Sequence, residues 1–193
     1  MVELTVARSE LILGGQKSGK SRRAEQLAAA WLTHSPAHRA VMIATAQAHD
    51  DEMRARIARH QRERAERVPG MTTLEAPRDL AAAIAQAGGA ETLCVVDCLT
   101  LWLTNLMMPA DPAQALQASA VVAAGDALCA AIADAPGPVV LVGNEIGLGV
   151  IPMGREVRQF VDALGRLNQR VAARCARVTL MAAGLPLTLK DET

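Results

Sequence analysis

The segment from residue 14 to residue 21 constrains the fold more than any other part of the chain. It reads Gly-Gly-Gln-Lys-Ser-Gly-Lys-Ser, which is the pattern G-x-x-x-x-G-K-S. An apolar run typical of a buried strand precedes it, and helix-forming residues continue from Arg22 to Trp31. A strand, a glycine-rich loop and a helix in this order form the phosphate-binding loop of nucleotide-binding proteins. The sequence therefore predicts that this chain binds a nucleoside triphosphate.

Each residue type in this loop has a chemical reason to be there. Glycines adopt backbone angles with positive φ, so that successive N–H groups turn inward around an anion. A helix that starts near Lys20 adds the positive end of its dipole at the same point. We expect Lys20 to reach the β- and γ-phosphates and the Ser21 hydroxyl to bind Mg²⁺. The predicted phosphate contacts are Gly14, Gly15, Gln16, Lys17, Ser18, Gly19, Lys20 and Ser21.

Strand-like and helix-like segments alternate along the rest of the chain. Apolar runs predict strands at residues 10–15, 40–45, 72–75, 92–96, 139–142 and 177–182, with an edge strand at 185–190. Helical patterns fall at residues 20–32, 50–67, 78–87, 99–107, 113–134 and 153–175. This alternation indicates an α/β protein with a mostly parallel sheet and helices on both faces. Together with the phosphate loop it predicts a P-loop NTPase fold of the RecA-like type, with residues 1–193 in a single nucleotide-binding catalytic domain.

Charge and aromatic content argue against a nucleic-acid partner. The formal net charge at neutral pH is zero, and the aromatic residues are Trp31, Trp102 and Phe160. Binding along a phosphate backbone needs a basic surface, and stacking on bases needs an aromatic platform. We therefore expect no nucleic acid among the partners.

Hydropathy and cysteine usage bear on where the protein works. No uncharged apolar run is long enough to span a bilayer, and the N-terminus lacks the basic-then-apolar pattern of a signal peptide. The cysteines have apolar neighbours and no C-x-x-C spacing, which predicts core thiols in a reducing compartment. They are Cys94, Cys98, Cys129 and Cys175. We expect a soluble, cytoplasmic protein without stable membrane insertion.

A second chemical signal is a carboxylate at the end of an apolar strand. Residues 93–96 read Leu-Cys-Val-Val, and Asp97 follows them. In folds with a phosphate loop an acidic residue at this place holds the Mg²⁺ shell, whereas on its own a strand-end Asp is also a common turn former. Because this chain carries a phosphate loop, we predict that Ser21 and Asp97 form a metal site.

The third signal is His60, within the helix predicted at residues 50–67. Met53, Ile57 and His60 share one helix face, which predicts that the imidazole points inward. Arg56 and Arg64 lie about one turn to either side, and their charges would attract a triphosphate. Taken alone, the pattern favours a packed core histidine over a catalytic one.

Several segments, taken together and in order, resemble a known enzyme family. They are residues 14–22 (GGQKSGKSR), 43–46 (IATA), 50–60 (DDEMRARIARH), 144–152 (NEIGLGVIP) and 165–170 (GRLNQR). This set is similar to the bifunctional adenosylcobinamide kinase/adenosylcobinamide-phosphate guanylyltransferase family, and the match continues to residues 184–190. Of these segments only the phosphate loop is widespread among other proteins.

The resemblance implies roles that the pattern alone leaves open. In that family the histidine matching His60 carries a covalent guanylyl group, so His60 and Lys20 are the implied catalytic residues. Further nucleotide contacts are implied at Ala44, Thr45, Ala46, Gln61, Arg62, Glu63, Arg64, Glu75 and Asp97. The implied setting is cobalamin biosynthesis, with adenosylcobinamide and its phosphate as partners, GTP and ATP as substrates, Mg²⁺ as cofactor and a homotrimer as the assembly.

Two other functional classes stay open at this point. A GTPase switch would need a guanine-reading N-K-x-D motif, and the nearest segment, residues 144–147, lacks the Lys and the Asp. A kinase of another small metabolite is compatible with the phosphate loop, but it leaves His60 and residues 144–152 without a role. Incorporation of label from α-labelled GTP into the protein would separate the bifunctional enzyme from both alternatives.

Overall fold

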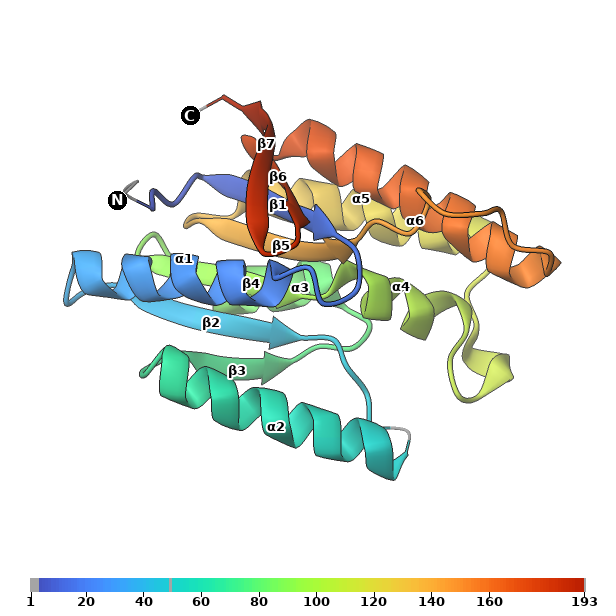
Figure 1. The fold of residues 1–193 in the computed structure, drawn as a ribbon, viewed down its shortest axis with the longest axis horizontal. Helices are drawn as coiled ribbons and strands as arrows, with labels where there is room; N and C mark the ends of the chain where they lie inside the picture. Colours follow the sequence, from blue (N-terminus) through green and yellow to red (C-terminus); the bar gives the residue numbers. More distant parts are fainter. Residues whose placement is uncertain (1–3, 49, 193) are drawn as a thin grey trace.

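One sheet runs through the computed structural model, which describes residues 4–48 and 50–192 (Figure 1). Its strands are β1 (Ser9–Gly14), β2 (Arg39–Ala44), β3 (Thr72–Glu75), β4 (Thr92–Asp97), β5 (Val139–Asn144), β6 (Arg177–Ala182) and β7 (Leu185–Asp191). Within the described residues these seven strands lie in the order β3-β2-β4-β5-β1-β6-β7. Neighbours are parallel except β6 and β7, which are antiparallel. The mostly parallel sheet predicted from the sequence is confirmed, and β7 is an edge strand as expected.

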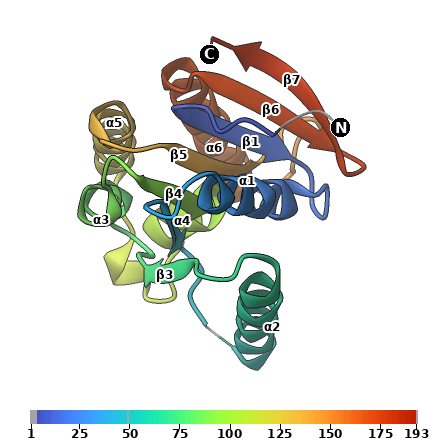
Figure 2. The ribbon, with the colours of Figure 1, turned by 90° about the vertical axis from the view of Figure 1, so that its left-hand side faces the viewer.

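Helices cover both faces of this sheet (Figure 2). The helices are α1 (Lys20–His34), α2 (Asp51–Arg67), α3 (Leu80–Ala87), α4 (Leu99–Met107), α5 (Ala118–Asp134) and α6 (Arg155–Arg174), with a 3-10 turn at Pro112–Gln114. Side chains of β1 alternate between two cores, because Leu11 and Leu13 pack with α3 to α6 whereas Ile12 packs with α1. The helix α2 lies outside these layers, beside β3 (Figure 1).

Parallel strands bring distant residues to one edge of the sheet. Gly14 at the end of β1 is opposite Asn144, and Ala44 at the end of β2 is opposite both Asp97 and Glu75. The strand β5 lies between β1 and β4, and this order agrees with the RecA-like fold class that the sequence predicts. In open α/β sheets ligands bind at the carboxyl ends of the strands, so this edge is where a site is expected.

Local capping explains where α2 and α3 begin. Asp50 accepts a hydrogen bond from the Met53 amide at 2.7 Å and caps α2. Asp79 does the same for Ala82 at 3.1 Å, so α3 begins at Leu80, two residues later than predicted. The helix α6 begins at Arg155, later than the residue 153 expected from the sequence. The Asp79 cap is a local hydrogen bond that periodicity does not register, whereas Gly154 at the N-cap of α6 makes no side-chain hydrogen bond in the described structure.

The first strand carries a buried carboxylate in an otherwise apolar core. Glu10 is fully buried, accepts a hydrogen bond from the Thr179 hydroxyl at 2.8 Å and is paired with Arg23 at 3.1 Å. Arg177 lies 3.7 Å from its second oxygen. A buried charge is tolerated only with such partners. The cysteines are buried and reduced, as the sequence predicts.

Candidate nucleotide-binding site

The phosphate loop folds tightly between β1 and α1. A Cβ at Gly14 would lie 2.5 Å from the Met181 carbonyl oxygen and from Ser18 Oγ, so no side chain fits there. Gly19 has φ of 100° at the N-cap of α1, a conformation that favours glycine. Lys17 also has positive φ, at 55°. This geometry turns the backbone of residues 15–19 around a small volume, as binding of a phosphate group requires.

The start of α1 is suited to an anion. In the described structure its N-cap makes no side-chain hydrogen bond, and its first turn contains no acidic residue. The first N–H groups of a helix have no partner inside the helix. They point toward the loop together with the positive end of the dipole, so an incoming phosphate would supply both the acceptor and the charge that they lack.

Lys20 is held at the loop by burial and by one hydrogen bond. Its side chain is 7 % exposed, and Nζ donates to the Gly15 carbonyl oxygen at 2.6 Å. Burial lowers the pKa of Lys20, while the nearby Cys98 and Asp97 raise it. The lysine is therefore placed where phosphate oxygens could replace a backbone carbonyl as its partner.

Asp97 and Ser21 fit the requirements of a Mg²⁺ site. Both are half-buried, Asp97 at the end of β4 and Ser21 in the first turn of α1. The influence of Asp97 on Lys20 shows that its carboxylate lies within electrostatic reach of the loop. A carboxylate and a hydroxyl are hard oxygen donors of the kind that Mg²⁺ prefers, with phosphate oxygens and waters completing the shell. The donor set therefore fits the metal predicted from the sequence.

Thr45 is engaged inside the protein. Its hydroxyl donates to the Cys98 carbonyl oxygen and accepts from the Cys98 amide, both at 2.8 Å. Its backbone N–H donates to the Asp97 carbonyl oxygen at 3.2 Å, and the side chain is 0 % exposed. We infer that Thr45 positions the turn after Asp97. Its contact with a nucleotide stays a prediction, and its hydroxyl is already fully used.

Asn105 is a buried amide that joins two of the edge loops, and it is absent from the residues predicted from the sequence. Its Nδ2 donates to the carbonyl oxygens of Thr45 at 2.8 Å and of Pro77 at 2.9 Å. One side chain in α4 thus ties the segment after β2 to the segment after β3. The available signal was the single amide side chain of a mostly apolar helix, because a buried polar group rarely lacks a hydrogen-bond partner.

The placement predicted for His60 is wrong, because this residue is exposed. Met53 and Ile57 on the same predicted face are only half-buried. The cause is the position of α2, which lies beside the sheet and is anchored mainly near its C-terminal end, where Val68 is buried and Arg67 pairs with Glu25 at 3.0 Å. Amphipathic spacing identified a helix face but could not show that the helix lies outside the core layers.

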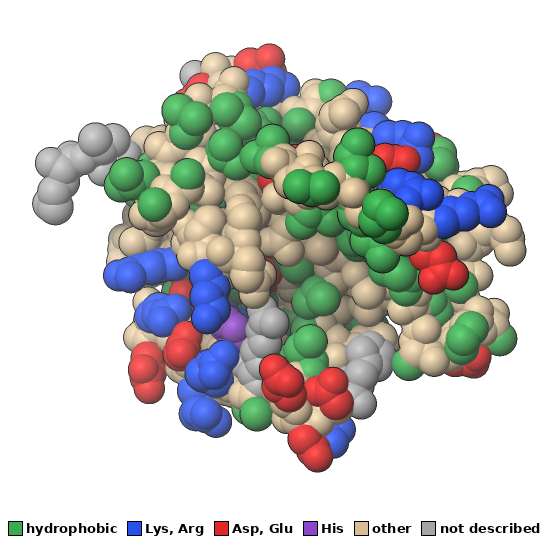
Figure 3. Space-filling view, turned by 45° about the vertical axis from the view of Figure 1, so that its right-hand side comes forward, with side chains coloured by type: hydrophobic (Ala, Val, Ile, Leu, Met, Phe, Trp, Pro, Cys, Tyr) green, Lys and Arg blue, Asp and Glu red, His purple; other side chains and the backbone are tan. Residues whose placement is uncertain are grey.

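Some of the other predicted nucleotide contacts are exposed side chains, and others are hydrogen-bonded or paired with residues of the protein. Gln61 and Arg62 are exposed on α2. Glu63 is paired with Arg67 at 3.2 Å, and Arg64 donates to the Thr73 hydroxyl at 3.1 Å. In the space-filling view of Figure 3, charged side chains gather over the lower part of the molecule, where α2 lies. Ala44, Ala46 and Glu75 lie at the carboxyl edge of the sheet, with Glu75 exposed.

The sheet order, the phosphate loop and the strand-end carboxylate define a P-loop NTPase. The chain belongs to the cobinamide kinase/cobinamide phosphate guanyltransferase family, whose model matches residues 10–189. It is therefore a nucleotide-using transferase of cobalamin biosynthesis.

Individual relatives agree with this assignment. The chain is 48 % identical, over 95 % of its length and 98 % of the relative's, to the bifunctional adenosylcobalamin biosynthesis protein CobP of Pseudomonas aeruginosa. It is 37 % identical to the corresponding CobU of Salmonella typhimurium, over 93 % of this chain and 98 % of that one. A solved structure from Pyrococcus horikoshii superposes with a TM-score of 0.54 at 9 % identity, covering 99 % and 90 % of the two chains, and supports the fold alone. In the described part of the chain, no helix combines the length and apolar character of a membrane span.

Proposed function

We propose that this chain phosphorylates adenosylcobinamide and then transfers a guanylyl group to the product, giving adenosylcobinamide-GDP. The observation that carries the proposal is the convergence of three groups at one sheet edge. These are the uncapped start of α1, the buried Lys20 and the Asp97 carboxylate within electrostatic reach of it. Family membership over nearly the whole chain identifies the reaction that such an edge would serve.

In the kinase step, the aminopropanol hydroxyl of adenosylcobinamide attacks the γ-phosphorus of ATP or GTP. The bond to the β–γ bridging oxygen breaks, the nucleoside diphosphate leaves, and the hydroxyl proton is released to solvent. The loop amides and Lys20 hold the phosphates in line with the attacking oxygen and balance the charge that develops. Mg²⁺ bound by Ser21 and Asp97 would supply further charge neutralisation.

In the transferase step, a ring nitrogen of His60 attacks the α-phosphorus of GTP and pyrophosphate leaves. A phosphate oxygen of adenosylcobinamide phosphate then attacks the guanylyl phosphorus, the P–N bond breaks, and His60 is regenerated. The exposure of His60 supports this role, because an exposed imidazole is open to both reactants. A single phosphate loop in the sequence favours one nucleotide site shared by both steps.

Further proposals concern the setting of the enzyme. We propose that it works in the cytoplasm as a homotrimer, with Mg²⁺ as the metal and without a nucleic-acid partner. The trimer is supported by the resemblance to the family, and the cytoplasmic setting by the buried reduced thiols. Sedimentation equilibrium at micromolar concentration measures the assembly directly.

The proposed function is tested by product analysis. The purified chain is incubated with adenosylcobinamide, MgATP and MgGTP, and the corrinoid products are separated and weighed by mass spectrometry. We expect both the phosphate and the GDP derivative. With His60→Ala, the phosphate alone should accumulate in a protein whose melting temperature is unchanged. Formation of the GDP derivative by folded His60→Ala would contradict the assigned nucleophile, and absence of both products from the wild type would favour a kinase of another metabolite.

A further inference from the structure

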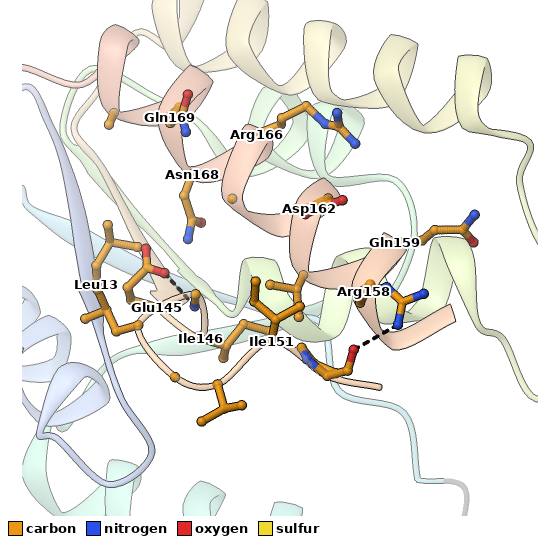
Figure 4. Close-up of a pocket in the computed structure, with 18 of the residues that line it drawn as sticks. Leu13, Glu145, Ile146, Ile151, Arg158, Gln159, Asp162, Arg166, Asn168 and Gln169 are labelled. Carbon is orange, nitrogen blue, oxygen red and sulfur yellow. Dashed lines mark hydrogen bonds between the residues drawn. The ribbon is translucent and has the colours of Figure 1, made fainter. Parts of the chain in front are cut away.

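A large groove lies on the α6 side of the sheet. It is bounded by α6, by the loop at residues 145–154 and by the β6–β7 hairpin, and its volume is about 1360 Å³ (Figure 4). Leu13 and Val178 line it from strands β1 and β6, while Leu189 and Lys190 line it from β7. Typical sites for small ligands measure roughly 300–1,000 Å³. The groove therefore suits a ligand larger than a nucleotide.

The groove adjoins the phosphate loop. Leu13 in its lining directly precedes Gly14, and the Glu145 amide donates to the Gly14 carbonyl oxygen at 3.1 Å. Asn144 is the strand partner of Gly14. A ligand lying in the groove would thus have one end beside the bound phosphates. An acceptor substrate needs this continuity, because its hydroxyl must reach the γ-phosphate in line.

The loop at residues 145–154 forms an apolar and exposed wall of the groove. Leu148, Val150 and Ile151 are 82 %, 96 % and 76 % exposed, and all three line the groove. Exposed apolar side chains concentrated in one segment mark a binding surface. The α6 side of the groove is polar, with amide side chains such as Gln159 and Gln169 and charged side chains such as Asp162 and Arg166. The combination fits a ligand that is apolar over much of its surface and carries amide groups at its rim.

Asn168 supplies an independent indication of a ligand. Its side chain is 4 % exposed, and Nδ2 donates to the Asn144 carbonyl oxygen at 3.1 Å. Its Oδ1 is buried and has no hydrogen-bond partner among the described residues. Figure 4 shows Asn168 directed from α6 toward the loop that carries Glu145. Leaving a buried acceptor without a partner is costly, and an amide N–H of a ligand would satisfy it.

We propose that this groove binds the corrinoid acceptor, with its macrocycle against the apolar loop and its carboxamide arms toward α6. The proposal rests on the proposed function and names the site of its second substrate. A corrin ring is a broad, largely apolar macrocycle with peripheral carboxamides, which matches the wall and rim described above. A second copy of the chain could also cover apolar side chains, but the continuity with the phosphate loop and the orphan amide oxygen of Asn168 favour the substrate.

The test uses the full-length protein and a matched pair of variants. Ile151→Asp places a charge in the groove at an exposed position, so folding should be unaffected. Val122→Asp places the same charge on α5, outside the groove, at a residue that is 54 % exposed. Asn168→Leu is the second groove variant, and its melting temperature is measured alongside. For each protein we measure the KM for adenosylcobinamide, the KM for ATP, labelling by α-labelled GTP, and the sedimentation mass.

We expect Ile151→Asp to raise the KM for adenosylcobinamide at least tenfold. Its KM for ATP should stay within about twofold, and its labelling by GTP, a half-reaction that contains no corrinoid, should match the wild type. Folded Asn168→Leu should likewise raise the KM for adenosylcobinamide while leaving the KM for ATP and the labelling by GTP unchanged. Val122→Asp should behave as wild type in all of these measurements. An unchanged KM for adenosylcobinamide in both groove variants overturns the proposal, as does a change of sedimentation mass, which would assign the groove to a second copy. If the wild type neither turns over adenosylcobinamide nor takes label, the proposed function itself fails, and this proposal fails with it.

Discussion

Replacing Thr45 by valine tests whether the turn after Asp97 is held as the structure indicates. Valine has nearly the shape of threonine but lacks the hydroxyl that bonds both the amide and the carbonyl of Cys98 at 2.8 Å. Because the site is fully buried, water cannot replace either bond. The Trp102 amide still donates to the Cys98 carbonyl oxygen at 3.1 Å, so Thr45→Val leaves only the Cys98 amide without a partner. An orphaned neutral group costs about 1–3 kcal/mol, and we expect Thr45→Val to lower the free energy of unfolding by about that amount.

Thr45→Ser is the matched control, since it keeps the hydroxyl and removes one methyl group. Its expected cost is about 1 kcal/mol. Urea unfolding of the three proteins, with the slope m compared to confirm the same two-state transition, gives these free energies. Thr45→Val should also weaken MgATP binding, because the lost hydroxyl bonds hold Cys98, the residue that directly follows Asp97. Equal unfolding free energies for the valine and serine variants would refute the reasoning.

Four further predictions concern charge and protonation. Lys20→Ala should reduce both activities about a hundredfold or more, and survival of either rate would reveal a second nucleotide site. Lys20→Met should raise the melting temperature without nucleotide, because the lowered pKa shows that the fold disfavours this charge, and an unchanged melting temperature would contradict that cost. Asp97→Asn should raise the Mg²⁺ concentration that gives half-maximal rate about tenfold. An unchanged Mg²⁺ titration would show that Asp97 forms the turn after β4 and does not bind the metal. Burial raises the pKa of Cys94 and Cys98 to about 11 from 9.0, so the folded state keeps protons that the unfolded chain releases. Stability should be intact below about pH 9 and fall as the pH rises toward 11, and a flat melting temperature across that range would contradict this.

Much of the fold could be predicted because the determining signals are local. The phosphate loop is specified by its own eight positions and by the strand and helix that flank it. Apolar runs for buried parallel strands and caps such as Asp50 depend on neighbours a few residues away. The strand-end position of Asp97 follows from the same local pattern, and parallel pairing then brings it to the edge shared with Gly14.

The features that escaped prediction depend on residues far apart in the chain. The local pattern places Glu10 at the start of an apolar strand, but its buried charge depends on Arg177 and Thr179, which no local pattern connects to it. The family resemblance implies that Thr45 contacts a nucleotide, and no local pattern shows that its hydroxyl is bonded to Cys98. The helix of His60 has the expected length, but spacing alone could not show that it lies beside the sheet rather than on it.

The central claim is that His60 carries the guanylyl group, and labelling with α-labelled GTP tests it most directly. The wild-type chain is incubated with MgGTP in the absence of corrinoid, denatured, digested and sequenced by mass spectrometry. The account predicts one GMP adduct per chain on His60, in a bond that is labile in acid and stable in base, as expected of a phosphoramidate. His60→Ala, with an unchanged melting temperature, should take no label. A stable adduct in that folded variant, or an adduct of the wild type on any other residue, would contradict the account.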